Sequence, residues 1–338
     1  MTPAETQQII DVLEKRILVL DGAMGTMLQR YNFDEADFRG ERFKNYHLSL
    51  KGNNDLLSLT QPEAIAEVHR QYFEAGADIV ETNTFSATSI AMADYDMQDL
   101  AYELNLESAK IARKIADEFT QADPQKRRFV AGSIGPTNKT ASLSPDVNRP
   151  EYRAITFDEL RIAYKEQVEG LFDGEVDLLL VETIFDTLNA KAALFAIDEV
   201  QEERNIDIPI MVSGTITDAS GRTLSGQTVE AFVTSVSHIP LLSIGFNCAL
   251  GAEQLEPYLK RLARQATCFT SAHPNAGLPN AFGEYDQSAE EMQALIEDYL
   301  KNELVNIIGG CCGTTPDHIK AIADVAQKYQ PRKLEVSI

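Results

Sequence analysis

Short apolar runs recur along the chain at intervals that suit alternating strands and helices. Most runs are almost continuously apolar, as expected for parallel strands that are covered on both faces. Candidate strands lie at residues 17–22, 78–85, 129–135, 177–183, 208–215, 241–248, 267–275 and 305–312. Segments with helical periodicity lie at residues 62–75, 100–119, 157–172, 188–203, 229–236, 253–265, 289–303 and 317–329.

The order of these segments predicts the fold. Thr60 and Thr315 stand just before prolines at the starts of two predicted helices, which is a common arrangement at helix N-termini. Eight repeats of strand and helix predict a closed (β/α)8 TIM barrel with parallel strands, and a doubly wound open sheet is the alternative. No linker divides the chain, so we predict a single domain over residues 1–338, with its core at about residues 15–330.

Two loops depart from the short connections typical of this fold. About forty residues, rich in Gly, Asn, Asp and aromatics, separate the first strand from the helix at residues 62–75. Loops of this length usually shape a functional site. A Gly-rich loop at residues 218–227 lacks the spacing of a phosphate-binding loop, and we predict that it covers the site or contacts a partner.

Composition limits the classes of binding partner and the cellular compartment that we expect for this protein. The formal net charge of −22 opposes binding to nucleic acid or to an anionic membrane. No run approaches the ~20 apolar residues that cross a bilayer, and no export signal begins the sequence. Four cysteines in 338 residues are too few for a disulfide scaffold. We therefore predict a cytoplasmic protein with reduced thiols.

Polar and reactive side chains that could take part in catalysis or binding occur where the predicted strands end. In a (β/α)8 barrel, catalytic groups come from the carboxyl ends of the strands and from the loops that follow. The candidates at these positions are Asp21, Gly22, Asn83, Glu182, Asn247, Cys248, Cys311 and Cys312. For Asn83 and Asn247, bonding to the loop backbone is an equally good interpretation.

The three cysteines predict a metal site. Adjacent residues of a regular strand point to opposite faces, but glycines on both sides of Cys311 and Cys312 permit a bend that turns both thiols one way. With Cys248 they form a set of three sulfur ligands, which favours zinc with one open coordination position. The alternative is that they are small buried apolar residues, as we predict for Cys268. A ligand role for His273 is not required.

An open position on such a centre suits a thiol substrate. A metal-bound thiol loses its proton, whereas a free thiol, with a pKa of about 8.5, is mostly protonated at neutral pH. Three anionic ligands limit how much charge zinc withdraws, so the bound sulfur should remain nucleophilic. The ligand set therefore predicts alkyl transfer to sulfur.

Six segments near strand ends form an ordered set of motifs. They are residues 21–26 (DGAMGT), 51–56 (KGNNDL), 135–138 (GPTN), 213–218 (SGTITD), 272–277 (AHPNAG) and 309–316 (GGCCGTTP). Together they resemble the homocysteine-binding module of cobalamin-dependent methionine synthases, over about residues 15–330. The wider homocysteine S-methyltransferase family, which includes betaine-homocysteine methyltransferase, shares the barrel and a zinc site with three cysteines.

The resemblance implies roles for particular residues. Cys248, Cys311 and Cys312 would bind zinc, Asp21 and Gly22 would hold the amino-acid end of homocysteine, and Glu182 would bind its ammonium group. The product would be methionine, and the methyl donor would be methylcobalamin. The sequence lacks the cobalamin-ligating Asp-x-His-x-x-Gly motif. We therefore expect the donor on folate- and cobalamin-binding modules that are missing here or belong to another polypeptide.

Three alternatives remain open. A small donor such as betaine or S-methylmethionine would replace methylcobalamin without changing the site. A non-catalytic barrel with a structural zinc would have a fourth protein ligand. A metal-free hydrolase would use carboxylates such as Asp21 and Glu182.

Overall fold

The computed structural model describes residues 3–217 and 220–334, and its strands are parallel. The strands are β1 (Leu18–Val19), β2 (Ile79–Glu81), β3 (Phe129–Ile134), β4 (Leu178–Ile184), β5 (Ile210–Gly214), β6 (Ser243–Gly251), β7 (Phe269–Asn275) and β8 (Ile307–Ile308). Their order in the sheet is β1-β8-β7-β6-β5-β4-β3-β2.

The two ends of this sheet meet, which closes the barrel. Leu20 forms a parallel bridge with Ile79. The Asp78 N–H donates to the Val19 carbonyl at 2.7 Å, and the Asp21 N–H donates to the Ile79 carbonyl at 3.0 Å. These contacts between β1 and β2 confirm the predicted (β/α)8 barrel and exclude an open doubly wound sheet.

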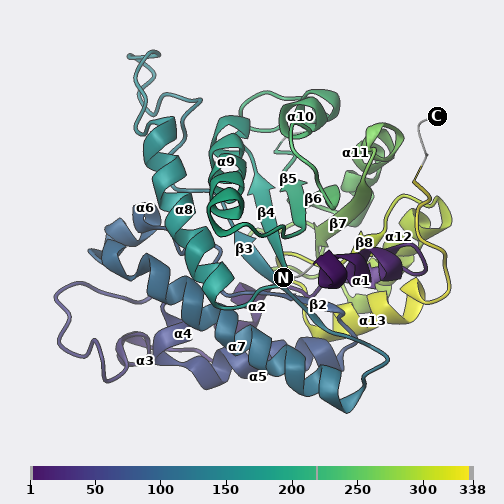
Figure 1. Cartoon of the computed structure of the whole chain (residues 1–338), viewed down its shortest axis with the longest axis horizontal. Helices are drawn as coiled ribbons and strands as arrows, with labels where there is room; N and C mark the ends of the chain where they lie inside the picture. Colours follow the sequence, from purple (N-terminus) through teal and green to yellow (C-terminus); the bar gives the residue numbers. More distant parts are fainter. Residues whose placement is uncertain (1–2, 218–219, 335–338) are drawn as a thin grey trace.

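Helices follow the strands and pack around the ring (Figure 1). The eight that complete the repeats are α5 (Pro62–Glu74), α7 (Ala101–Ala122), α8 (Phe157–Asp173), α9 (Thr187–Arg204), α10 (Val229–Val236), α11 (Ala252–Gln265), α12 (Ala289–Lys301) and α13 (Pro316–Ala326). Additional helices that the sequence analysis did not predict are α1 (Pro3–Leu13), α2 (Met24–Gln29), α3 (Glu35–Arg39), α4 (Leu57–Thr60) and α6 (Ser89–Met92). In the described residues, no helix combines the length and apolar character needed to span a membrane.

The strands predicted at residues 17–22 and 305–312 are much shorter in the structure. Beyond Val19 and Ile308 both segments leave the regular ladder. They nevertheless stay joined, because the Gly310 N–H donates to the Asp21 carbonyl at 3.1 Å. The irregular backbone at this junction carries residues of the candidate site.

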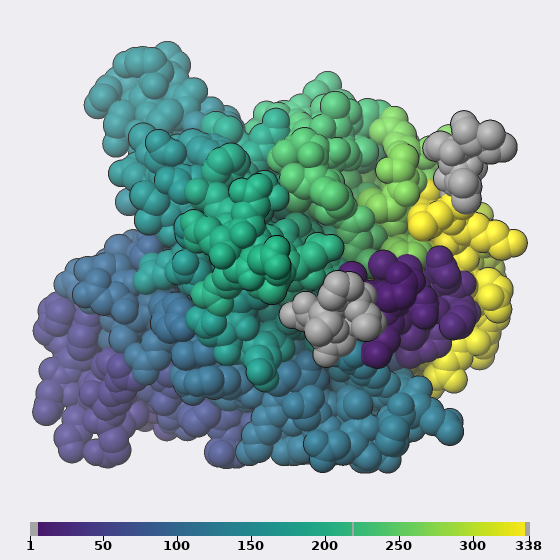
Figure 2. Space-filling model, in the orientation of Figure 1, coloured from purple at the N-terminus to yellow at the C-terminus, as the bar shows by residue number. Residues whose placement is uncertain are grey.

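The barrel interior is filled by apolar side chains and is covered at one end by α1. Ile9 and Leu13 of α1 are buried against an inner cluster that includes Leu18, Leu180 and Met211. Helix α1 lies over the face that Figures 1 and 2 turn toward the viewer, while the teal segment between β3 and α8 projects at the upper left. With its interior filled and this end covered, the barrel presents its polar strand ends on the other side.

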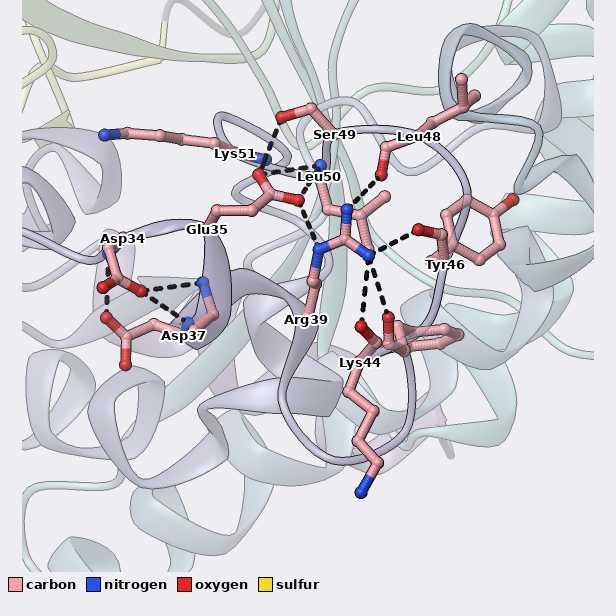
Figure 3. Close-up of polar contacts among 12 residues, drawn as sticks. Asp34, Glu35, Asp37, Arg39, Lys44, Tyr46, Leu48, Ser49, Leu50 and Lys51 are labelled. Carbon is pink, nitrogen blue, oxygen red and sulfur yellow. Dashed lines mark hydrogen bonds and ion pairs between the residues drawn. The ribbon is translucent and has the colours of Figure 1, made fainter.

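The long first loop is held in shape by two charged side chains (Figure 3). The Glu35 carboxylate accepts hydrogen bonds from the Leu50 and Lys51 N–H groups, both at 2.9 Å, and from the Ser49 hydroxyl at 2.7 Å. Arg39 donates to Glu35 at 2.7 Å and also to several carbonyls of residues 43–48. This network fixes the loop immediately before residues 52–55, which line the main cavity.

Replacing Glu35 with alanine should loosen this loop. The Leu50 N–H bond leads the contacts that lower the Glu35 pKa to about 2, so the carboxylate is charged and hydrogen-bonded at neutral pH. Hydrogen bonds to charged groups contribute about 1.5–3 kcal/mol, so the Leu50 and Lys51 amides should exchange at least ~10-fold faster in Glu35→Ala. Amide hydrogen exchange measures this change.

The same carboxylate gives the loop a pH dependence. The pKa of Glu35 in the fold lies below its ordinary value of 4.5, so its contribution to stability is present above pH 4.5 and is lost as the pH falls toward 2. Protection of the Leu50 amide should fall over this range in the wild type.

The control for Glu35→Ala is Glu41→Ala, because the Glu41 side chain is 94% exposed and its replacement should leave exchange unchanged. Equal exchange in the Glu35 and Glu41 variants would contradict the assignment.

Candidate functional site

The structure brings together the three cysteines that the sequence analysis singled out. Cys248 lies in β6, whereas Cys311 and Cys312 follow β8. Their Sγ atoms all lie within 4.8 Å of one another, and the Cys248 and Cys312 sulfurs are 3.7 Å apart. Among the described His, Cys, Asp and Glu residues, this is the group placed to share a metal ion.

Left-handed backbone in β6 places the first of these thiols. Cys248 has φ 60° and Ala249 has φ 56°. The pairing of β6 with β7 shifts register between Asn247 and Gly251. A left-handed conformation costs about 1–2 kcal/mol for a residue with a Cβ atom, so the surrounding pairing must hold this geometry in place. The shift ends the regular alternation just where the thiol is needed.

The adjacent pair turns as the flanking glycines predict. The Cys311 N–H donates to the Pro274 carbonyl at 2.9 Å, and Gly313 has φ 79°. A Cβ atom on Gly313 would lie 2.3 Å from the Cβ atom of Tyr285. Glycine at position 313 therefore permits both the turn and the close approach of Tyr285 to Cys312.

Hydrogen bonds among the thiols lower the pKa of one of them and raise the pKa of another. Bonds from Cys248 and then Cys311 lower the pKa of Cys312 to about 3. Bonds to Cys248 and Cys312, with burial, raise the pKa of Cys311 well above its ordinary value. Tyr285 also hydrogen-bonds Cys312, and burial followed by the Cys312 charge raises the pKa of its hydroxyl. Without a bound cation, the group thus favours one thiolate stabilised by its neighbours, since three adjacent negative charges would repel one another.

Asn247 connects the thiols to the carboxyl side of the site. Its amide group donates to the Thr183 hydroxyl at 2.7 Å and to Glu182 Oε2 at 3.3 Å, and it lies 3.9 Å from Cys311 Sγ. Its side-chain oxygen accepts from the Thr183 N–H at 3.0 Å and from the Ser213 hydroxyl at 2.7 Å. The side chain is therefore fixed between the two halves of the site.

Three carboxyl groups face one another beside the thiols. Asp21 follows β1, Glu81 ends β2 and Glu182 lies in β4. The Glu182 carboxylate accepts from the Ser133 hydroxyl at 2.6 Å and also hydrogen-bonds Glu81. One Asp21 oxygen, Oδ2, accepts the Glu81 N–H at 3.0 Å, while the other is buried without a hydrogen-bond partner among the described residues. Burial is the main cause of the raised pKa of each of these carboxyls.

Two other predicted residues line the same region in different ways. A Cβ atom on Gly22 would lie 2.7 Å from Thr314 Oγ1, so only glycine fits this backbone position without displacing neighbours. Both amide hydrogens of Asn83 are engaged, with the Asn54 carbonyl at 2.8 Å and the Ser58 hydroxyl at 3.1 Å. Asn83 thereby joins the long first loop to the end of β2, and its substrate contact stays a prediction.

One large cavity unites these groups, and its volume is about 1350 Å³. It is lined by every candidate residue from the sequence analysis, by residues 52–55 of the first loop and by Tyr285. His273 also lines it, and burial lowers the pKa of this imidazole to about 3, so the ring is neutral. Cys268 precedes β7 and lies outside the cavity, as do the described residues 220–227 of the second loop. The first two residues of that loop, 218 and 219, lie outside the described residues.

The sequence analysis missed Glu81 and Tyr285. The predicted strand ran from residue 78 to residue 85 and placed Glu81 inside it, whereas in the structure β2 ends at Glu81. A charged residue that ends an apolar run was the available signal. Tyr285 lies in a loop between β7 and α12, where nothing in the local pattern indicates contact with Cys312.

Comparison with known proteins identifies the family and the fold. The family model for homocysteine S-methyltransferase matches residues 18–326. The metallated form of the homocysteine methyltransferase MmuM from Escherichia coli is 25% identical, with a TM-score of 0.71 over 95% of this chain and 99% of that one. The oxidised form of MmuM, at 24% identity and a TM-score of 0.72 over the same shares, shows a similar fold. The chain belongs to the homocysteine S-methyltransferase family.

Proposed function

We propose that this protein transfers a methyl group to the thiol of homocysteine, giving methionine, and that Cys248, Cys311 and Cys312 hold a catalytic zinc ion. The observation that carries the proposal is the convergence of three thiols within 4.8 Å of one another in a cavity that is also lined by a carboxyl cluster. A thiol amino acid offers one sulfur and one ammonium group, so its two ends match the two clusters.

The residues present fit zinc. Sulfur ligands favour zinc over the harder divalent ions, and a cation would offset the repulsion between three adjacent thiolates. Zinc bound here would keep the homocysteine sulfur deprotonated and nucleophilic near neutral pH. Among the described His, Cys, Asp and Glu residues, no fourth side chain joins the three cysteines in this group. This supports an open catalytic centre over a structural zinc closed by four protein ligands.

The chain's own residues would orient the substrate. Glu182 and Asp21 are the proposed acceptors for the ammonium group, because Asp21 Oδ1 is buried and has no hydrogen-bond partner in the described part of the chain, and Glu182 is fixed by Ser133. The backbone at Gly22 would approach the amino-acid carboxylate closely, since it carries no side chain. Asn247 would fix the distance between the ammonium and sulfur ends, because it contacts both clusters. Holding the two reactants in line is the main contribution available to such a site.

The proposed methyl donor is methylcobalamin carried by a partner module or polypeptide. The cavity of about 1350 Å³ exceeds the ~300–1000 Å³ of typical ligand pockets, so it has room for a donor beside homocysteine. The six motifs favour this donor. A small donor such as betaine or S-methylmethionine is the second candidate, supported by the likeness to the homocysteine methyltransferase MmuM, which extends over 99% of that chain.

The zinc assignment predicts different effects of two cysteine substitutions. Cys248→Ala removes one of three ligands and should weaken zinc binding by more than ~100-fold, since loss of outer-shell partners alone costs 10–100-fold. Cys268→Ala is the matched control, because Cys268 lies outside the cluster. Metal analysis after dialysis against a chelator measures both. Equal zinc content in the two variants would exclude the proposed ligand set.

The turn after Cys312 gives a second test. Gly313 and Gly226 both have positive φ, 79° and 93°, so alanine strains the backbone at each position. Only at Gly313 would the new Cβ atom also collide, at 2.3 Å, with Tyr285. We expect Gly313→Ala to lower zinc affinity by at least ~10-fold and Gly226→Ala to leave it unchanged. A competition titration with a zinc chelator measures the affinities, and an unchanged value for Gly313→Ala would contradict this role of the turn.

The donor can be identified by turnover. Zinc-loaded protein should form methionine from homocysteine and free methylcobalamin, and much less from betaine or S-methylmethionine at equal concentrations. Mass spectrometry of the methionine product, with an isotopically labelled methyl group on each donor in turn, distinguishes the sources. Product from S-methylmethionine alone would replace the cobalamin proposal by the second candidate, and no product from any donor would contradict methyl transfer.

A further inference from the structure

Glu81 is a carboxyl group of the site to which the proposed function gives no task. It ends β2, and its backbone N–H donates to Asp21 Oδ2 at 3.0 Å. Its side chain hydrogen-bonds the Glu182 carboxyl and lines the same cavity. Glu81 therefore touches both residues that are proposed to receive the substrate ammonium.

The contact between the two glutamates requires a proton. Ionised carboxylates only accept hydrogen bonds, so two of them bond to each other only when one is protonated. Glu182 accepts additional bonds from the hydroxyls of Ser133, at 2.6 Å, and Thr183, at 3.3 Å, and from the Asn247 amide at 3.3 Å. Such donors stabilise the ionised form of a carboxyl group.

The surroundings of Glu81 favour its neutral form. Burial, followed by the charges of Glu182 and Asp21, raises the pKa of Glu81 well above its ordinary value. The hydrogen bonds from Ser133 and Glu81 act in the opposite direction on Glu182. The proton of the pair therefore belongs on Glu81, and Glu182 carries the charge.

The charge of homocysteine agrees with a neutral Glu81 beside an ionised Glu182. Homocysteine brings one ammonium group, whereas Asp21, Glu81 and Glu182 would carry three negative charges if all were ionised. Of the described residues that line the cavity, Arg30 and Lys320 are the Lys or Arg side chains, and no hydrogen bond or ion pair joins either to these carboxyls. A neutral Glu81 removes one of the excess charges and supplies a donor in its place.

We propose that Glu81 is a positioning residue that stays protonated and donates a hydrogen bond to Glu182, which orients that carboxylate toward the substrate ammonium. The inference rests on the proposed function, because it takes homocysteine as the ligand. In this role Glu81 helps to recognise the amino group of the substrate and takes no part in binding its sulfur. Glutamine at position 81 keeps a neutral donor of similar shape, whereas alanine removes it.

Binding of two thiols by the zinc-loaded full chain tests the role. The probes are homocysteine and 4-mercaptobutanoate, which has the same thiol and carboxylate but no amino group. Isothermal titration should show Glu81→Ala weakening homocysteine binding at least ~10-fold while changing 4-mercaptobutanoate less than ~3-fold. Glu81→Gln should bind both probes within ~3-fold of the wild type. Glu290→Gln, an exposed acid on the rim of the same cavity, is the control and should change neither.

An infrared measurement tests the proton directly and needs no ligand. The difference spectrum between wild type and Glu81→Gln at pH 7 should contain the C=O band of a protonated carboxyl group. Absence of that band would overturn the proposal, as would a loss of homocysteine affinity in Glu81→Gln as large as in Glu81→Ala. Equal losses for both thiols in Glu81→Ala would indicate a merely structural role and would also overturn it. If the wild type binds no homocysteine, the proposed function itself fails, and the infrared band still reports the state of Glu81.

Discussion

The contact between the ends of β1 and β8 is the constraint on which the site depends. The Gly310 N–H donates to the Asp21 carbonyl at 3.1 Å, and a Cβ atom on Gly309 would lie 2.8 Å from the Leu20 side chain. Backbone this close leaves no space for side chains at the glycines. The contact continues the pairing of β1 with β8 beyond the regular ladder and places Asp21 beside the thiol pair that follows β8.

Left-handed backbone supplies the rest of the geometry. Thr183 in β4 and Cys248 in β6 have φ 54° and 60°, at points where each strand shifts register against a neighbour. These conformations turn Glu182 and the Cys248 thiol away from regular strand directions. Asn247 then bonds across the gap, so strained backbone on two strands is held by one buried amide. Buried polar networks of this kind are rigid only when their members are satisfied.

The site concentrates acidic side chains in two places within an already acidic protein of net charge −22. Thiols gather at one place and carboxyls at the other, and each group alone would be destabilised by repulsion and burial. A metal cation at the thiols and an ammonium group at the carboxyls would relieve both. This complementarity is the physical basis for proposing zinc and homocysteine together, and it explains why one carboxyl is better neutral than charged.

The sequence by itself predicted the barrel, the wider family and a set of candidate residues that the structure brings to one cavity. Nearly continuous apolar runs separated by helical periods predicted parallel strands covered on both faces. The contacts between β1 and β2 were needed to exclude an open sheet with the same pattern. Glycines around Cys311 and Cys312 likewise predicted a turn, since local backbone freedom is a property of local sequence. Only the tertiary structure decided that α1 covers the barrel, that Tyr285 approaches Cys312 and that Glu81 bonds Glu182. These depend on which strand ends the closed ring brings together, and the protonation of a carboxyl depends on neighbours that lie far away in the chain.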